Sequence, residues 1–267
     1  MILGLTTALV GSAAVRIEST GSFDLPLPTV AVAWVDHSRL LVLSAEELQL
    51  LEARDGTLVA RLLIPGRASP ARIAAGLILP DPETSTAWVL SNRRASAVLV
   101  EWSSRTISVR SEAPKLPWPG SPTGLRFLPG TNWLDGEVPL VGPGPFLALA
   151  TGEPSLAVLR DGTVGMGPGA KEELDVGEMQ ALGPTLAGLW PHWFAASTAL
   201  PPGEPDALLI MAVSGGRLAE IQTHPVRGSI RALSAQCEGR AVLVALVVEG
   251  DSGRFRLEIL RLERTVG

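Results

Sequence analysis

Residues whose types could support catalysis are few and scattered in this chain of 267 residues. Ser252 lies in the segment Gly250-Asp-Ser-Gly253, a context in which a serine nucleophile can occur. Such a serine needs a histidine as base and an aspartate to orient it. The three histidines, His37, His192 and His224, do not stand in a matching sequence context. Because apolar segments flank Asp-Ser-Gly on both sides, the segment instead predicts a hairpin turn.

A glycine-rich segment, Gly165-Met-Gly-Pro-Gly-Ala-Lys171, superficially resembles a phosphate-binding loop. A phosphate-binding loop requires Gly-Lys followed by Ser or Thr, so that backbone amides and the lysine hold phosphate and the hydroxyl holds magnesium. Here Ala170 precedes the lysine and Glu172 follows it, and no strand–helix–strand pattern surrounds the segment. We therefore interpret it as a flexible loop.

Metal ligands and paired carboxylates are equally sparse. Three isolated histidines and the single Cys237 give no zinc-binding spacing. One acidic run lacks the alternating spacing of a calcium loop, and we interpret it as a solvated face: Glu172, Glu173, Asp175 and Glu178. Asp135 and Glu137 form a carboxylate pair in a long loop, but glycoside hydrolysis depends on a separation that sequence does not reveal. We expect no catalytic residues, no metal and no cofactor, and we favour a protein that is not an enzyme.

Aromatic residues are the strongest candidates for contact with a partner. Trp190-Pro-His-Trp-Phe194 contains three aromatic side chains within five residues. One interpretation is that Trp190, Trp193 and Phe194 fill space between structural units, and the other is that they anchor a protein partner, since Trp is enriched at binding hot spots. Trp118 and Trp133, in a second long loop, have the same two interpretations.

The composition limits the classes of partner. Apolar residues make up 46% of the chain and charged residues 18%, which excludes intrinsic disorder. The net charge of −5, with Arg93-Arg94 as the only basic pair, disfavours a nucleic-acid partner. Cys237 has no second cysteine with which to form an intrachain disulfide. The apolar segment Met1–Ala14 is too short to span a membrane as a helix and lacks a positive n-region, so we expect an intracellular protein, with export as the alternative.

The elements that must position these residues are strands. Helical periodicity is almost absent, and short runs rich in Val, Leu, Ile and Ala alternate with Gly, Pro, Asp and Ser. Arg-Asp-Gly-Thr occurs at Arg54–Thr57 and again at Arg160–Thr163, 106 residues later, each time next to apolar runs. Asp-Gly accepts the positive φ of tight hairpin turns. We interpret the two copies as equivalent hairpins of a repeated unit.

The strands group into units of four, a pattern typical of propeller blades, which repeat about every 40–50 residues. Long insertions at Leu128–Pro145 and Pro191–Pro205 make the spacing irregular. The sequence predicts an all-β, β-propeller-like fold with about five or six irregular four-stranded blades. We expect a single domain over residues 1–267 whose termini share one blade, and the alternative is a β-sandwich plus a small barrel.

A family resemblance supports this expectation. The segment Leu48–Leu62, which contains the first Arg-Asp-Gly-Thr, resembles the inner hairpin of WD40-like and quinoprotein-like β-propellers, and Ala207–Ile221 is similar. The resemblance implies a WD repeat-like propeller.

Together these observations favour a non-catalytic protein–protein interaction module, a propeller subunit or scaffold that presents aromatic loops to a partner in a complex. Its contacts would be Trp190, Trp193 and Phe194, with Trp118 and Trp133 as secondary candidates. The alternative is an exported propeller enzyme or carbohydrate-binding protein with a site in the central channel. That alternative predicts inward-facing polar residues such as Asp36, His37 and His192.

Overall fold

The computed structural model describes residues 14–65, 78–90, 97–113, 146–150, 156–159, 162–167, 172–200 and 204–265. All regular secondary structure within these ranges is β-strand, arranged as five antiparallel sheets of four strands each. The expected all-β, propeller-like fold is confirmed. Over the same ranges there is no helix with the length and apolar character needed to cross a membrane.

The first three sheets follow the chain in simple order. Sheet 1 contains β2 (Thr29–Trp34), β3 (Arg39–Ser44), β4 (Glu47–Glu52) and β5 (Leu58–Leu63). Sheet 2 contains β6 (Ile78–Asp81), β7 (Thr86–Leu90), β8 (Ala97–Trp102) and β9 (Ile107–Ala113). Sheet 3 contains β10 (Phe146–Ala150), β11 (Leu156–Leu159), β12 (Val164–Met166) and β13 (Glu172–Glu173).

The last two sheets include the two ends of the described chain. Sheet 4 contains β14 (Leu182–Trp190), β15 (Trp193–Thr198), β16 (Ala207–Ser214) and β17 (Arg217–Pro225). Sheet 5 contains β18 (Ser229–Glu238), β19 (Ala241–Glu249), β20 (Phe255–Thr265) and, as its outermost strand, β1 (Ala14–Leu25). The β1–β20 register runs from Ala14 opposite Thr265 to Leu25 opposite Phe255. Pairing with β1 covers the edge of β20 that would otherwise be exposed.

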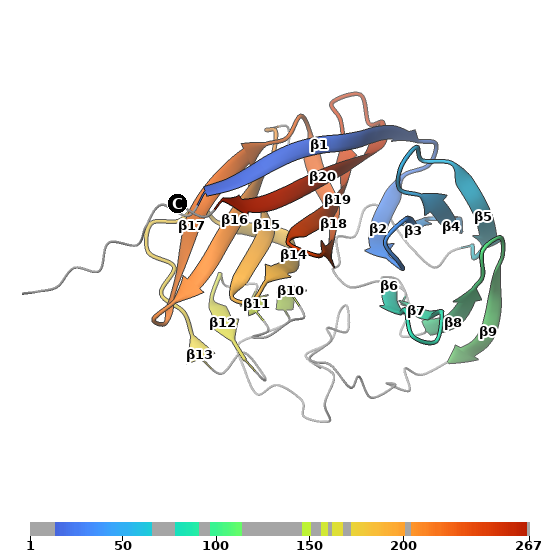
Figure 1. The fold of residues 1–267 in the computed structure, drawn as a ribbon, viewed down its shortest axis with the longest axis horizontal. Helices are drawn as coiled ribbons and strands as arrows, with labels where there is room; N and C mark the ends of the chain where they lie inside the picture. Colours follow the sequence, from blue (N-terminus) through green and yellow to red (C-terminus); the bar gives the residue numbers. More distant parts are fainter. Residues whose placement is uncertain are drawn as a thin grey trace, which may run out of the picture.

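The sheets are arranged around a common centre in the order 2, 1, 5, 4, 3, and their innermost strands are β6, β2, β18, β14 and β10 (Figure 1). Contacts between innermost strands link the neighbours: β6 with β2, β2 with β18, β18 with β14, and β14 with β10. The turns that follow β2 and β6 are thereby brought together with the end of β18.

Burial on both faces explains why the inner strand β2 is an almost continuous apolar run. Along β2, Ala31 and Ala33 pack in the core between sheets 1 and 2. Val32 and Trp34 point the other way, into the core between sheets 1 and 5. Side chains alternate across a strand, so a sheet packed on both faces needs apolar residues at every position. The outermost β5, by contrast, is half-exposed along its length.

One expected insertion is a strand. The segment that we assigned to the insertion Pro191–Pro205 contains β15, which is fully buried and pairs with β14 and β16. Pro191 and His192 form the whole connection from β14 to β15, and His192 adopts a φ of 64°. Proline followed by a residue with positive φ is a turn pattern. The first four residues of β15 are all apolar and the last two, Ser197 and Thr198, are buried polar residues, so the strand lacks the alternation by which half-buried strands are recognised. Leu128–Pro145 lies outside the described residues.

The two Arg-Asp-Gly-Thr copies are not equivalent, contrary to our interpretation. The first connects β4 to β5, the third and fourth strands of sheet 1. The second lies between β11 and β12, the second and third strands of sheet 3. Sheet 3 begins at Phe146 and ends with β13, so its Asp-Gly turn comes one strand earlier than the Asp-Gly turn of sheet 1. Gly56 and Gly162 nonetheless both adopt positive φ, as the hairpin interpretation requires.

Candidate binding site

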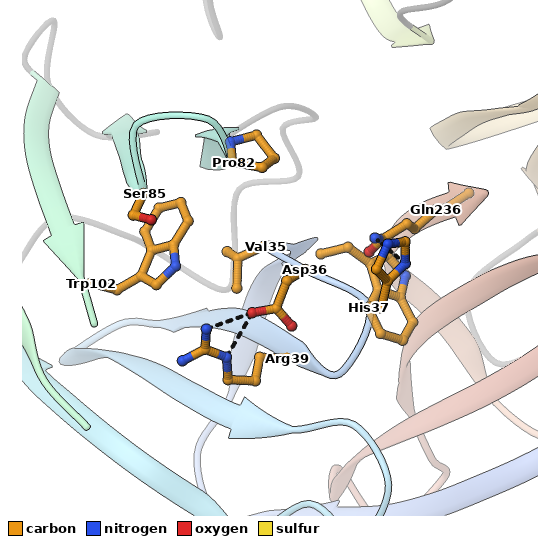
Figure 2. A pocket seen from close by; sticks show the side chains of 10 residues that line it. Val35, Asp36, His37, Arg39, Pro82, Ser85, Trp102 and Gln236 are labelled. Atoms are coloured by element: carbon orange, nitrogen blue, oxygen red, sulfur yellow. Dashed lines mark hydrogen bonds and ion pairs between the residues drawn. The ribbon is translucent and has the colours of Figure 1, made fainter. Parts of the chain in front are cut away.

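A depression of about 400 Å³ opens where sheets 1, 2 and 5 meet. Its wall is formed by the turn after β2, the turn after β6, the end of β8 and the end of β18. Figure 2 shows Trp102, Ser85 and Pro82 on one side, His37 with Gln236 on the other, and the Asp36–Arg39 pair between them. The lining residues are Trp34, Val35, Asp36, His37, Arg39, Pro82, Ser85, Trp102, Ala235 and Gln236.

Asp36 organises the turn between β2 and β3. Its Oδ1 accepts hydrogen bonds from the backbone N–H of Ser38 at 2.8 Å and from the Ser38 hydroxyl at 3.0 Å. Its Oδ2 accepts from Arg39 Nε at 2.7 Å and forms an ion pair with Arg39 Nη2 at 2.6 Å. Asp side chains favour such turns because they bond to backbone two residues further on. The carboxylate therefore has both oxygens engaged by groups of its own turn.

Arg39 extends this arrangement to the next sheet. Its Nη1 donates to the backbone carbonyl of Ser103, just after β8, at 2.9 Å. A planar guanidinium can make such bonds in several fixed directions at once. The Asp36–Arg39 pair thus fixes the turn of sheet 1 against the turn of sheet 2.

The pKa of Asp36 lies below its ordinary value. Partial burial alone would raise it, but the hydrogen bonds from Arg39 and Ser38 and the Arg39 charge outweigh that effect. A carboxylate held ionised in this way is a weak proton acceptor. Among the described residues that line the depression, Asp36 is the only one with a carboxylate. Those residues therefore include no carboxylate that is suited to act as a general base.

The side of the depression formed by sheets 1 and 5 has unsatisfied hydrogen-bonding groups. Gln236 Nε2 lies 3.2 Å from His37 Nδ1. Gln236 Oε1 and Trp34 Nε1 are buried, and neither has a hydrogen-bond partner among the described residues. The backbone N–H of Trp34 donates to Ser234 Oγ at 3.2 Å, which holds β2 beside β18. Buried polar groups in proteins are normally paired, so these two atoms require an explanation.

The opposite wall contains a strained residue beside an aromatic one. Ser85 adopts a φ of 53°, which is uncommon for a residue other than glycine. Its carbonyl accepts from the backbone N–H of Trp102 at 3.1 Å, so the turn after β6 is tied to the end of β8. Trp102 is largely buried and presents one part of its indole to the depression. Backbone strain of this kind concentrates at functional sites.

The described aromatic residues that the sequence singled out lie on the two faces of sheet 4. Trp190 and Trp193 pack in the core toward sheet 5, and Phe194 packs in the core toward sheet 3. Phe194 is 1% exposed and Trp193 is 7% exposed, both within apolar cores. Trp190 is half-buried and packs edge-on against Trp193, with ring centroids 5.9 Å apart. The Arg264 guanidinium lies over the ring of Trp193, 4.6 Å from its centroid. A partner at this turn would reach Trp190 before the other two, and their role in binding stays a prediction; Trp118 and Trp133 lie outside the described residues.

The polar residues named for the alternative function are brought together only in part. Asp36 and His37 line the depression. His192 is exposed in the turn after β14, in sheet 4, and does not line it. Arg39, Ser85, Trp102 and Gln236 were missed by the sequence analysis. The three-residue spacing of Asp36 and Arg39 next to a strand end is a signal that could have identified the pair, whereas the others become neighbours only through the fold.

The remaining sequence candidates have structural positions. Gly250–Gly253 forms the turn between β19 and β20, with Gly253 N–H donating to the Gly250 carbonyl at 2.8 Å. Gly165 lies in β12, and Lys171 lies outside the described residues, as do Asp135 and Glu137. The described members of the acidic run, Glu172 to Glu178, are exposed. Over the described ranges, His, Cys, Asp and Glu side chains do not gather in threes that could hold a metal ion.

Comparison with known proteins identifies the fold and no more. No protein-family model matches the chain. No curated protein matches its sequence. Among solved structures, the RRP9 WD40 repeats align with a TM-score of 0.52 at 13% identity, over 93% of this chain and 97% of that chain. A putative oxidoreductase (glucose dehydrogenase) from Thermus thermophilus aligns with a TM-score of 0.50 at 14% identity, over 93% of this chain and 100% of that chain. The expected resemblance to WD40-like and quinoprotein-like propellers is thus confirmed as a likeness of fold.

Proposed function

We propose that this protein is an interaction module whose propeller-like fold presents the depression between sheets 1, 2 and 5 to a protein partner. The observation that carries the proposal is the state of Asp36. Its two oxygens accept from Ser38 and Arg39, so the carboxylate is used to shape the depression and not to move protons. What the depression offers a ligand is an indole, an imidazole and an amide, which suit recognition.

Turns on a rigid β-scaffold are where binding surfaces usually develop. The turns around the depression are held by bonds between sheets, including Arg39 to Ser103 and Trp34 to Ser234. A surface that is already ordered loses little conformational entropy on binding. This rigidity supports docking of a partner without rearrangement of the module.

A second candidate is carbohydrate binding in the same depression. The observation that favours it is Trp102 in the wall beside Ser85, with His37 and Gln236 opposite. An aromatic face next to a few convergent polar groups is a common composition for small-molecule sites.

The test compares capture of partners from the native host by four forms of the full-length protein. Gln236→Arg places a bulky charge in the depression, and Gln180→Arg makes the same change at an exposed residue outside it. Trp190→Ala tests the aromatic turn of sheet 4. We expect Gln236→Arg to abolish capture of a specific protein that the wild type, Gln180→Arg and Trp190→Ala all retain.

Loss of capture in Trp190→Ala alone would move the docking surface to the aromatic turn. Capture that is equal in all four forms, or displaced from the wild type by added monosaccharides, would contradict protein docking at the depression. Circular dichroism and thermal unfolding of each variant identify any loss that is due to misfolding.

A further inference from the structure

The chemistry of the depression also points to the type of group that it receives, an inference that rests on the proposed function. We propose that the depression binds a neutral side-chain carboxamide of the partner. An ionised side chain would be a poor ligand.

The charges in the wall are compensated within the protein. Asp36 and Arg39 form an ion pair, and the third guanidinium nitrogen, Nη1, donates to the Ser103 carbonyl. Among the described lining residues, Asp36 is the only acidic residue and Arg39 is the only Arg or Lys. A carboxylate or ammonium entering this site would lose hydration without gaining an uncompensated opposite charge, which is unfavourable. The charge balance therefore favours a neutral ligand.

The His37–Gln236 pair can present either a donor or an acceptor. In the observed arrangement the Gln236 amide nitrogen can only donate, so His37 Nδ1 accepts and the neutral ring carries its proton on Nε2. A half-turn of the Gln236 amide places Oε1 on His37 Nδ1–H and leaves His37 Nε2 as an acceptor. His37 Nε2 has no partner among the described residues, and His37 is exposed. His37 Nε2 is thus a donor in the observed arrangement and an acceptor after the half-turn, so the pair can match either the carbonyl or the N–H of a ligand.

In the observed orientation of the Gln236 amide, the two buried atoms that lack a hydrogen-bond partner among the described residues are also complementary to an amide. Trp34 Nε1 is a donor and Gln236 Oε1 is an acceptor, and both residues line the depression. An unsatisfied buried polar atom costs roughly 1–3 kcal/mol, so a ligand that pairs even one of them gains affinity. Both atoms are covered in this structure, and a ligand reaches Gln236 Oε1 once the half-buried Gln236 side chain rotates. An amide supplies one carbonyl and one or two N–H groups, which suits this pair.

The volume of the depression and the surface of its wall agree with an amide ligand. A volume of about 400 Å³ lies toward the small end of ligand pockets and accommodates a residue or two of a partner segment. Trp102 and Pro82 provide flat apolar surface on one side of it. A planar amide can pack on such a surface while its edge faces His37.

The test uses blocked tripeptides and the indole N–H signals of the nitrogen-15-labelled, full-length protein. Acetyl-Gly-Asn-Gly-amide is compared with the Asp and Lys peptides of the same design, because Asn and Asp are nearly isosteric and differ in charge. Methyl glucoside serves as the carbohydrate probe. The Trp34 and Trp102 signals are assigned by Trp→Phe substitution, and the peptides are also titrated into Gln236→Leu and His37→Ala.

We expect the Asn peptide to shift the Trp34 and Trp102 signals with a dissociation constant about tenfold lower than that of the Asp and Lys peptides, a difference of about 1.4 kcal/mol. Its affinity is expected to change little between low and high salt, because no ion pair forms. Gln236→Leu and His37→Ala should weaken it, whereas Gln180→Leu should not.

Tighter binding of the Asp or Lys peptide would overturn the amide assignment and leave protein docking intact. Binding of methyl glucoside in preference to every peptide would overturn both the amide assignment and the proposed protein partner. If none of the probes shifts either signal at about 10 mM, where even ligands in the millimolar range are largely bound, the amide assignment is wrong. The capture experiment then decides the proposed function on its own.

Discussion

The ring of Phe23 in β1 packs directly on Gly56, the glycine of the turn between β4 and β5. A Cβ atom added to Gly56 would lie 2.8 Å from Phe23 Cγ. Gly56 also adopts a φ of 71°, which side-chain-bearing residues rarely accept. The contact joins the outermost strand of sheet 5 to the first Arg-Asp-Gly-Thr turn in sheet 1. That turn is therefore a packing site between sheets as well as a hairpin.

Gly56→Ala should destabilise the protein more than Gly162→Ala, the same change in the second Arg-Asp-Gly-Thr copy. Both glycines have positive φ, but a Cβ at Gly162 would meet no atom within 4 Å. We expect a loss of about 1 kcal/mol for Gly162→Ala from backbone strain alone, and an additional 1–3 kcal/mol or so for Gly56→Ala from overpacking. Urea denaturation of the two variants measures the difference. Equal losses would show that the Phe23 contact contributes nothing.

Asp36→Asn should lower stability at neutral pH by roughly 1 kcal/mol, because it removes the ion pair with a partly exposed Arg39. The pKa of Asp36 is lowered in the folded state, so its contribution is present above the ordinary value of 3.8 and is lost as the pH falls below it. The wild type and Asp36→Asn should therefore converge in stability under acid conditions. Denaturation curves at neutral and acid pH test this, and a constant gap between the two proteins would contradict it.

The sequence predicted the class of fold because hairpin turns and short apolar runs are local signals. It did not reveal β15, since Trp193–Thr198 is buried on both faces and lacks alternation. It wrongly treated the two Arg-Asp-Gly-Thr copies as equivalent, because an Asp-Gly turn indicates a hairpin but not which pair of strands the turn joins. The sequence identified only part of the depression. Asp36 and His37 are adjacent in the sequence and were named. Ser85, Trp102 and Gln236 become their neighbours only when sheets 1, 2 and 5 meet.

Arg264→Ala should destabilise the junction of sheets 4 and 5. The guanidinium lies 4.6 Å from the Trp193 ring centroid and 6.0 Å from that of Trp190. Cation–π contacts of this kind contribute about 0.5–2 kcal/mol. Thermal unfolding should show a clear loss for Arg264→Ala and a smaller one for Arg264→Lys. Arg16→Ala is the control, because Arg16 forms only an exposed ion pair with Glu18 at 3.6 Å, and it should have little effect.

Asp206, which joins sheet 4 to sheet 5, should make the wild-type protein less stable as the pH rises. Asp206→Asn should remove this pH dependence. Burial raises the pKa of Asp206, and the hydrogen bond from Ile230 N–H at 2.7 Å together with the Arg231 charge offsets this only in part. A carboxyl whose pKa is higher in the folded state contributes less to the free energy of unfolding as the pH rises. The contribution falls between the ordinary pKa of 3.8 and the higher pKa of the folded state. Asn keeps an oxygen that can accept from Ile230. Stability measured across the mildly acid range should be flatter in Asp206→Asn, and an identical slope in both proteins would contradict the prediction.

Hydrogen–deuterium exchange of the protein with and without its captured partner shows whether the depression between sheets 1, 2 and 5 is the docking site. We predict slower exchange in the complex at the turns after β2, β6 and β8 and at the end of β18. The turn at Pro191-His192 and the outer strand β5 should exchange as in the free protein. Protection confined to Pro191-His192 or to the outer strands, with none around Asp36, Ser85 and Gln236, would contradict the account.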